Sequence, residues 1–156
     1  MAGYDQRSQL QEFTSNVFIS NTFGARNKDL LHKVGITHIL ICAAEQEPIF
    51  PNDFTYLRLE AFADNNTPDR NDLQPHVVTA LPWIQRARAG GGRVLLHCAA
   101  GISRSGAIAV AFTMWESKLT FETALARVRQ ARAIVDPNPG FGEQLGRMDL
   151  QALLAS

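Results

Sequence analysis

The sequence RVLLHCAAGISRSG occupies residues 93–106 and sets the frame for interpreting the rest of the chain. Its first part, residues 93–97, is an apolar run typical of a buried strand. Residues 105–118 are small and apolar, which indicates a buried helix. Cys98, five further residues and Arg104 therefore join a buried strand directly to a buried helix. This arrangement predicts a layered α/β fold.

Strands alternate with helices along the whole chain. Further strands are predicted for residues 17–20, 37–42 and 54–59, and further helices for residues 26–33, 73–89, 121–133 and 141–154. Turn-forming residues mark loops at 45–53, 64–71 and 136–140, and Pro82 is expected to kink its helix. The alternation predicts a central, mostly parallel sheet flanked by helices. In such sheets an active site lies beyond the carboxyl ends of the strands, which is where Cys98 would be.

Length and composition indicate one globular domain and give no signal for binding nucleic acid or crossing a membrane. The 156 residues suit a single domain, residues 1–156, with a core at about 16–154. Apolar residues make up 46% of the chain, and its 15 basic and 15 acidic residues cancel, so no global signal points to nucleic acid. No apolar run approaches the roughly 20 residues that span a bilayer. We therefore expect a monomer without a membrane segment or a nucleic-acid partner.

Cysteine and histidine usage bears on location and cofactors. Two cysteines are too few for a disulfide framework, which favours a reducing, intracellular setting. Residues 1–11 are polar and include an acid, unlike a signal peptide. The two cysteines and four scattered histidines have no zinc-ligand spacing. We expect a cytoplasmic or nuclear protein that needs no metal and no cofactor.

The segment between Cys98 and Arg104 is suited to binding an anion. A short loop that enters a helix points backbone N–H groups inward, and the helix N-terminus adds positive potential. The loop amides that would face the anion belong to Ala99, Ala100, Gly101, Ile102 and Ser103. Arg104 adds a planar fork that can bind two phosphate oxygens at once. The same field favours a reactive thiolate at Cys98.

The alternative interpretation is a buried cysteine at a strand end, with Arg104 as a surface residue of a helix. A cysteine and an arginine at this spacing are a weak signal on their own. Here the preceding strand, the following helix, the small loop residues, His97 and Ser105 all agree with one another. We therefore favour the functional interpretation.

The stretch HCAAGISRSG resembles the signature loop of the cysteine-based protein tyrosine phosphatase superfamily, specifically that of dual-specificity phosphatases. The resemblance extends over about residues 16–145 and includes GITHILICAAE and DPNPGF. The chain is also similar to the phospho-Ser/Thr/Tyr-interacting branch. Some members of that branch are catalytically dead because they lack the nucleophile, whereas Cys98 is present here.

The resemblance implies a mechanism. Cys98 attacks phosphorus and forms a phosphocysteine, and Arg104 holds the phosphate. A carboxylic acid protonates the leaving oxygen and later activates water. Asp64 matches the family's acid best, and Asp69 and Asp72 are the alternatives; as plain structural residues these two would be a turn residue and a helix N-cap. Ser105 would hydrogen-bond the thiolate or, alternatively, cap the helix start.

Three further residues have implied supporting roles. His97 resembles the family's buried histidine, which braces the loop. Asn138 would brace the phosphate loop or position water, and a simple turn-forming role explains it equally well. Cys42 resembles a cysteine of the tensin-homologue lipid phosphatase that can pair with the nucleophile. It implies a reversible Cys42–Cys98 disulfide, and the alternative is a buried core cysteine.

The minimal size implies a shallow pocket that accepts phosphotyrosine, phosphoserine and phosphothreonine in a protein substrate, which could itself be a protein kinase. One alternative is a non-protein ester such as a phosphoinositide, a phosphoglycan or an RNA 5′ end. Another is a pseudophosphatase that binds phosphoproteins without turnover. A sulfurtransferase that carries a persulfide on Cys98 fits the flanking sequence least well.

Overall fold

A computed structural model describes residues 6–64 and 73–155 of the chain. The fold is built on a five-stranded sheet with the strand order β1-β2-β5-β3-β4. The strands are β1 (Gln11–Thr14), β2 (Val17–Ser20), β3 (His38–Ile41), β4 (Thr55–Arg58) and β5 (Val94–His97). Only the β1–β2 pair is antiparallel, and the other three pairs are parallel. The predicted α/β fold with a mostly parallel sheet is confirmed.

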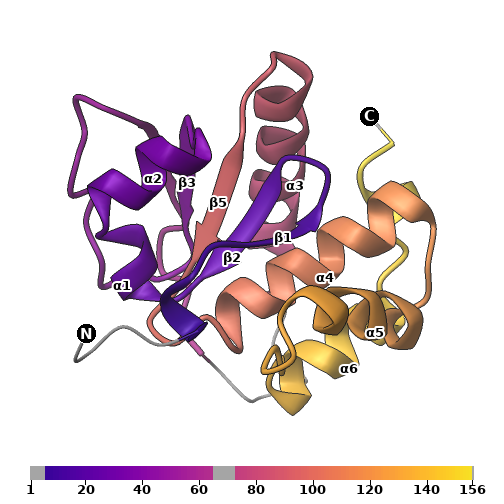
Figure 1. Cartoon of the computed structure of the whole chain (residues 1–156). Coiled ribbons are helices and arrows are strands. Elements are labelled where there is room, and N and C mark those ends of the chain that lie inside the picture. The colour runs from indigo at the N-terminus through magenta and orange to yellow at the C-terminus, as the bar shows by residue number, and fades with distance from the viewer. Residues whose placement is uncertain (1–5, 65–72, 156) are drawn as a thin grey trace.

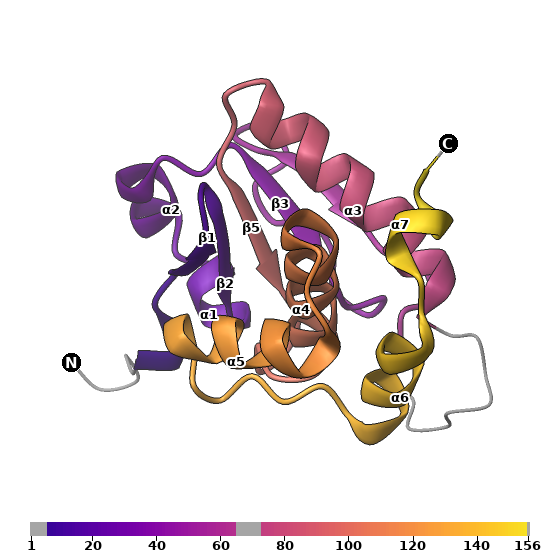
Figure 2. The same cartoon turned by 90° about the vertical axis from the view of Figure 1, so that its right-hand side faces the viewer.

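Helices cover both faces of this sheet (Figures 1 and 2). The short helices α1 (Thr22–Ala25) and α2 (Lys28–Val34) lie on one side, and α3 to α6 lie on the other. The bounds of the remaining elements are Gln6–Ser8 for the 3-10 helix η1, Gln74–Ala89 for α3, Arg104–Ser117 for α4, Phe121–Ala131 for α5, Pro139–Arg147 for α6 and Leu150–Leu153 for α7. Helix α3 contains Pro82 and continues to Ala89.

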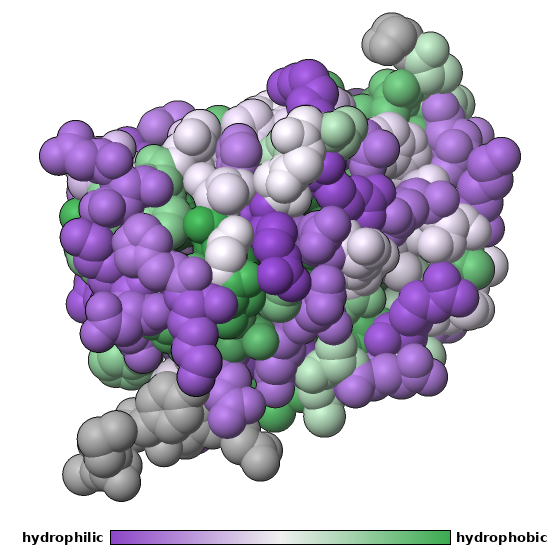
Figure 3. Space-filling view, turned by 45° about the horizontal axis from the view of Figure 1, so that its top comes forward, coloured by the Kyte–Doolittle hydropathy of each residue, from purple (hydrophilic) through white to green (hydrophobic). Residues whose placement is uncertain are grey.

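Strand β5 and helix α4 are apolar because both are buried in the interior of the fold. Every residue of β2 and β5 is buried, as is every residue of α4 from Ser105 to Met114. Strands that are covered on both faces need continuous apolar runs rather than an alternating pattern. Hydrophilic side chains cover most of the face seen in Figure 3. Among the described residues, no helix is long and apolar enough to cross a membrane.

Strand β1 is absent from the sequence prediction. Its residues QEFT are mostly polar, and only Phe13 is buried. The strand forms because the chain turns back at Asn16, whose φ of 63° lies in the left-handed region that asparagine tolerates. It then pairs with β2 at the edge of the sheet, where a short polar strand is usual.

The prediction was wrong at two helices. Residues 141–154 are not one helix, because Met148 adopts an extended conformation and Asp149 caps a new helix by accepting from the Ala152 amide. An aspartate favours this N-cap position over a helix interior. The helix expected at 26–33 starts at Lys28, and the separate helix α1 precedes it.

Candidate active site

The site begins where three parallel strands end side by side. The register places Ser20 of β2, His97 of β5 and Ile41 of β3 in one row across the sheet. The residues that follow this row therefore emerge at the same edge. They include Cys98 and Cys42, and the Cys42 amide donates to the His97 carbonyl at 2.7 Å.

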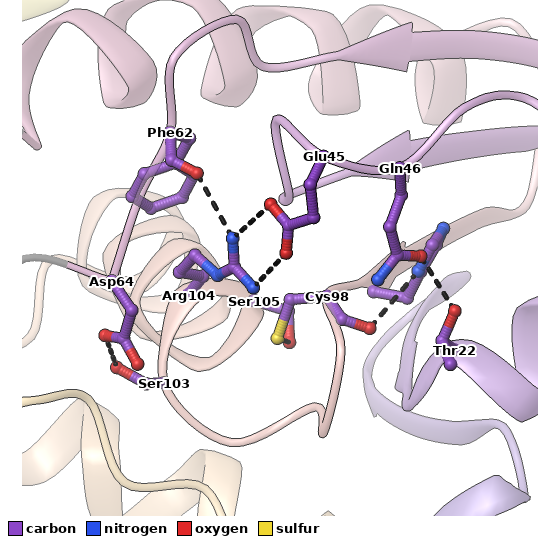
Figure 4. Close-up of polar contacts among 10 residues, drawn as sticks. Thr22, Glu45, Gln46, Phe62, Asp64, Cys98, Ser103, Arg104 and Ser105 are labelled. Atoms are coloured by element: carbon purple, nitrogen blue, oxygen red, sulfur yellow. Dashed lines mark hydrogen bonds and ion pairs between the residues drawn. The ribbon is translucent and has the colours of Figure 1, made fainter.

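Cys98 lies at the bottom of the loop that joins β5 to α4, and only 2% of it is exposed. Its Sγ is 3.1 Å from the hydroxyl of Ser105, which belongs to the first turn of α4 and is fully buried. The two side chains face each other inside the loop (Figure 4). Ser105 thus contacts the predicted nucleophile rather than capping the helix.

Arg104 is held by Glu45, an acid in the segment 45–53 that the sequence predicts to be an ordinary loop. Glu45 Oε1 and Oε2 accept from its Nη2 and Nη1 at 2.7 and 2.8 Å, and the Phe62 carbonyl accepts from Nη1 at 3.3 Å. The hydrogen bonds between the two side chains raise the pKa of Arg104 and lower the pKa of Glu45. One signal in the sequence could have identified Glu45. It lies shortly after the predicted strand 37–42, and the carboxyl end of that strand is at the site.

The ion pair leaves one edge of the guanidinium for a ligand. Arginine carries five N–H donors, and the contacts with Glu45 and Phe62 use three of them. The Nε hydrogen and the second Nη2 hydrogen have no partner among the described residues. These two donors are parallel neighbours and can bind two oxygens of one phosphate.

Asp64 lies at the rim of the same loop. Its Oδ1 accepts from the Ser103 hydroxyl at 2.7 Å and from Asn138 Nδ2 at 2.6 Å. The Asp64–Ser103 contact lies beside Arg104 in Figure 4. The two alternative acids, Asp69 and Asp72, lie outside the described residues.

Asn138 joins three parts of the site. Its side-chain oxygen caps α6 by accepting from the Phe141 amide, and its own amide donates to the Ser103 hydroxyl at 3.0 Å. Together with the contact to Asp64, these bonds tie the start of α6 to the loop. The geometry thus combines a turn-forming role with contact to the loop.

His97 is buried directly behind the predicted nucleophile. Its Nδ1 is 3.4 Å from the Cys98 carbonyl oxygen. Burial lowers the pKa of His97 to about 4, and the nearby charge of Arg26 adds to the effect. The imidazole is therefore neutral at physiological pH, which suits a support for the loop rather than a proton carrier.

Cys42 is fully buried beside the site, and both cysteines are free. Burial raises the pKa of Cys42 well above its usual value, and the neighbouring Cys98 raises it further. Cys42 is therefore a thiol in this state, and its pairing with Cys98 stays a prediction.

The carbonyl groups of the loop are bound from outside. At its two ends, Ala99 O accepts from the Thr22 amide and Ile102 O accepts from the Asp136 amide, both at 3.0 Å. Between them, Arg132 donates to the carbonyls of Ala100 and Gly101, although the sequence predicts this residue only as part of the helix at 121–133. No local pattern in the sequence singles it out.

These features agree with the comparison to known protein families. Residues 17–150 match the family described as "Dual specificity phosphatase, catalytic domain". The chain therefore belongs to the dual specificity phosphatases of the cysteine-based protein tyrosine phosphatase superfamily.

Individual proteins are similar to this chain in sequence or in structure. The chain is 36% identical over 140 residues to dual specificity protein phosphatase 1B of Arabidopsis thaliana, covering 90% of this chain and 81% of that protein. The crystal structure of DUSP15 matches with a TM-score of 0.84 and 30% identity, covering 95% of this chain and 94% of that one. Other relatives are much longer. The chain is 35% identical over 134 residues to MAP kinase phosphatase with leucine-rich repeats protein 3 of Dictyostelium discoideum, covering 86% of this chain but only 15% of that protein.

Proposed function

We propose that this chain is an active, metal-independent phosphatase that hydrolyses phosphotyrosine and phosphoserine or phosphothreonine in proteins. The observation that carries the proposal is the combination of Cys98, 3.1 Å from Ser105, with the free edge of Arg104 at the opposite end of one loop. The proposed nucleophile, Cys98, and the phosphate-binding guanidinium of Arg104 thus lie at the two ends of a single anion-binding loop. Membership of the family supports the same reaction.

In the first step, the Cys98 thiolate attacks phosphorus in line with the leaving oxygen. The S–P bond forms and the P–O bond breaks, while Arg104 and the loop amides stabilise charge on the three other oxygens. Asp64 gives its proton to the leaving oxygen. Because these donors supply the charge stabilisation, the step requires no metal ion.

In the second step, water attacks the phosphocysteine. The Asp64 carboxylate accepts a proton from this water, inorganic phosphate forms, and the S–P bond breaks. Sulfur leaves as a thiolate, and the Ser105 hydroxyl stabilises it by hydrogen bonding. Ser103 and Asn138 hold the Asp64 carboxylate at the rim of the loop, which supports its role in both proton transfers.

Relatives support a protein substrate. The Arabidopsis relative is named a dual specificity protein phosphatase, and the Dictyostelium relative a MAP kinase phosphatase. A phosphorylated protein kinase is therefore one substrate to test.

The decisive experiment compares phosphopeptides carrying phosphotyrosine, phosphothreonine or phosphoserine with a phosphoinositide headgroup, a phosphoglycan and a 5′-phosphorylated RNA. Phosphate release is measured in the presence of a chelator, with Cys98→Ser as the inactive control. Turnover of phosphotyrosine and phosphothreonine peptides, lost in Cys98→Ser, is expected. Preference for a non-protein ester would reassign the substrate. Phosphopeptide binding without turnover by the wild type would make the chain a binding module.

A further inference from the structure

We propose that Arg132 is a positioning residue that sets the direction of the loop amides and so creates the oxyanion site. The proposal deepens the function proposed above and rests on it. Arg132 is the largest fully buried side chain of the described residues, and only 2% of it is exposed. Burying a guanidinium is costly unless its N–H groups are satisfied by well-placed acceptors. The choice of acceptors therefore indicates what this buried charge does.

Two acceptors of Arg132 are carbonyls of the loop. Nε donates to the Gly101 carbonyl at 2.9 Å, and Nη2 donates to the Ala100 carbonyl at 3.2 Å. Nη1 donates to Gln11 Oε1 on β1 at 2.8 Å. One planar group thus binds two successive carbonyls of the loop and anchors them to the edge strand.

Binding a carbonyl also orients an amide. In a trans peptide the C=O and the N–H of the same plane point in opposite directions, and the described residues contain no cis peptide bond. The Ala100 carbonyl shares its plane with the Gly101 N–H, and the Gly101 carbonyl shares its plane with the Ile102 N–H. Holding both carbonyls outward therefore turns both N–H groups toward the inside of the loop.

The conformation of Gly101 shows how closely the loop is fitted to Arg132. Its φ is +70°, and a Cβ at this position would lie 2.7 Å from Arg132 Nη2 and 2.6 Å from the Ser20 carbonyl oxygen. A residue with a side chain would both strain the backbone and push the guanidinium away. Glycine is thus needed for the contact as well as for the turn.

The contact also changes the strength of the amides. A cation bonded to a carbonyl oxygen polarises the peptide group, so its N–H becomes a stronger donor. The amides of residues 99–103 have no partner among the described residues, which leaves them available for an oxyanion. Arg132 therefore acts on bound phosphate through the backbone without touching it.

The test compares Arg132→Met with a matched control, Arg88→Met. The Arg88 side chain is also largely buried, at 15% exposed, and it forms an ion pair with Glu116 and donates to the Ser15 carbonyl, away from the loop. Binding of inorganic tungstate is measured by calorimetry, and aryl phosphate turnover is measured alongside, both well below the melting temperature of each variant. Both substitutions are expected to lower the melting temperature. Only Arg132→Met is expected to weaken tungstate binding and to lower kcat, each by roughly ten- to a hundredfold.

Each outcome decides the proposal. Tungstate affinity that is unchanged in Arg132→Met, or lowered equally in Arg88→Met, would reduce Arg132 to a packing role. If Arg132→Met does not fold, Arg132→Lys replaces it. The lysine ammonium can bind one of the two carbonyls but cannot bind both as the planar guanidinium does. Arg132→Lys is therefore expected to lose less tungstate affinity than Arg132→Met. An Arg132→Lys variant with wild-type tungstate affinity would overturn the proposal. A wild type that binds tungstate but hydrolyses nothing would refute the proposed function alone. A wild type that does not bind tungstate would refute both.

Discussion

Arg104 and Glu45 form a two-point ion pair, with Nη2–Oε1 and Nη1–Oε2 distances of 2.7 and 2.8 Å. The pair lies across one end of the Cys98 loop, so the acid determines which edge of the guanidinium faces a bound phosphate (Figure 4). Both carboxylate oxygens of Glu45 are engaged by this pair, and we expect the pair to limit the rotation of the Arg104 side chain.

Glu45→Ala is therefore expected to lower kcat/KM for an aryl phosphate by roughly ten- to a hundredfold. The reason is that a misplaced Arg104 guanidinium no longer holds the phosphate in the reactive orientation. The matched control is Glu47→Ala, which removes an exposed acid of the same loop that pairs with Arg58 instead. Steady-state kinetics of both variants check the prediction. Equal activities in the two variants would contradict a specific role for Glu45.

Asp64→Asn is expected to slow hydrolysis by roughly a hundred- to a thousandfold for poor leaving groups and far less for good ones, since only poor leaving groups need a proton. The measurement is a series of aryl phosphates with increasing leaving-group basicity. Asp69→Asn and Asp72→Asn are the controls. If one of these controls shows the leaving-group dependence and Asp64→Asn does not, the acid is reassigned to that residue.

His97 makes folding stability depend on pH. Its pKa is lowered from 6.5 to about 4 in the folded state by burial, so the unfolded chain binds more protons between these values. The stability that neutral His97 contributes should therefore be fully present above pH 6.5. As the pH drops to about 4, the free energy of unfolding should fall by roughly 3 kcal/mol. Denaturant titrations of the wild type and His97→Asn measure this difference. His97→Asn should show a weaker pH dependence over that range, and parallel curves would contradict the assignment.

Cys42 and Cys98 directly follow Ile41 of β3 and His97 of β5, which are paired in the sheet, so we predict that peroxide links them. The Cys98 thiolate attacks peroxide and breaks the O–O bond, giving a sulfenic acid and hydroxide, which takes a proton from solvent to become water. The Cys42 thiol then attacks this sulfur, and a second water leaves as the disulfide forms. Because burial raises the pKa of Cys42, the second step should become faster with increasing pH.

Mass spectrometry of peroxide-treated protein checks this pairing. The wild type should lose two hydrogens and recover activity with a thiol reductant. Cys42→Ser should instead gain oxygens irreversibly at Cys98. Over-oxidation of the wild type at the same rate as Cys42→Ser would show that Cys42 is only a core residue.

Much of the site was predictable because its chemistry is local. An apolar run, a cysteine, small loop residues, an arginine and a small-residue helix follow one another directly at residues 93–118. Peptide geometry and the helix N-terminus then determine the anion-binding character without reference to distant residues. The parallel sheet followed from the same kind of local pattern, since buried strands and amphipathic helices have different periods.

Tertiary structure alone decided what surrounds the loop. Glu45 is 59 positions from Arg104 in sequence, and Arg132 is 31 positions from Gly101, so neither pairing leaves a local signal. Glu45 reaches Arg104 because the β3–β5 register brings the two strand ends together, and Arg132 reaches the loop because α5 packs against β1. The sequence by itself thus predicted the nucleophile and the phosphate-binding arginine, whereas packing determined how both side chains are held, because orientation depends on contacts between distant elements.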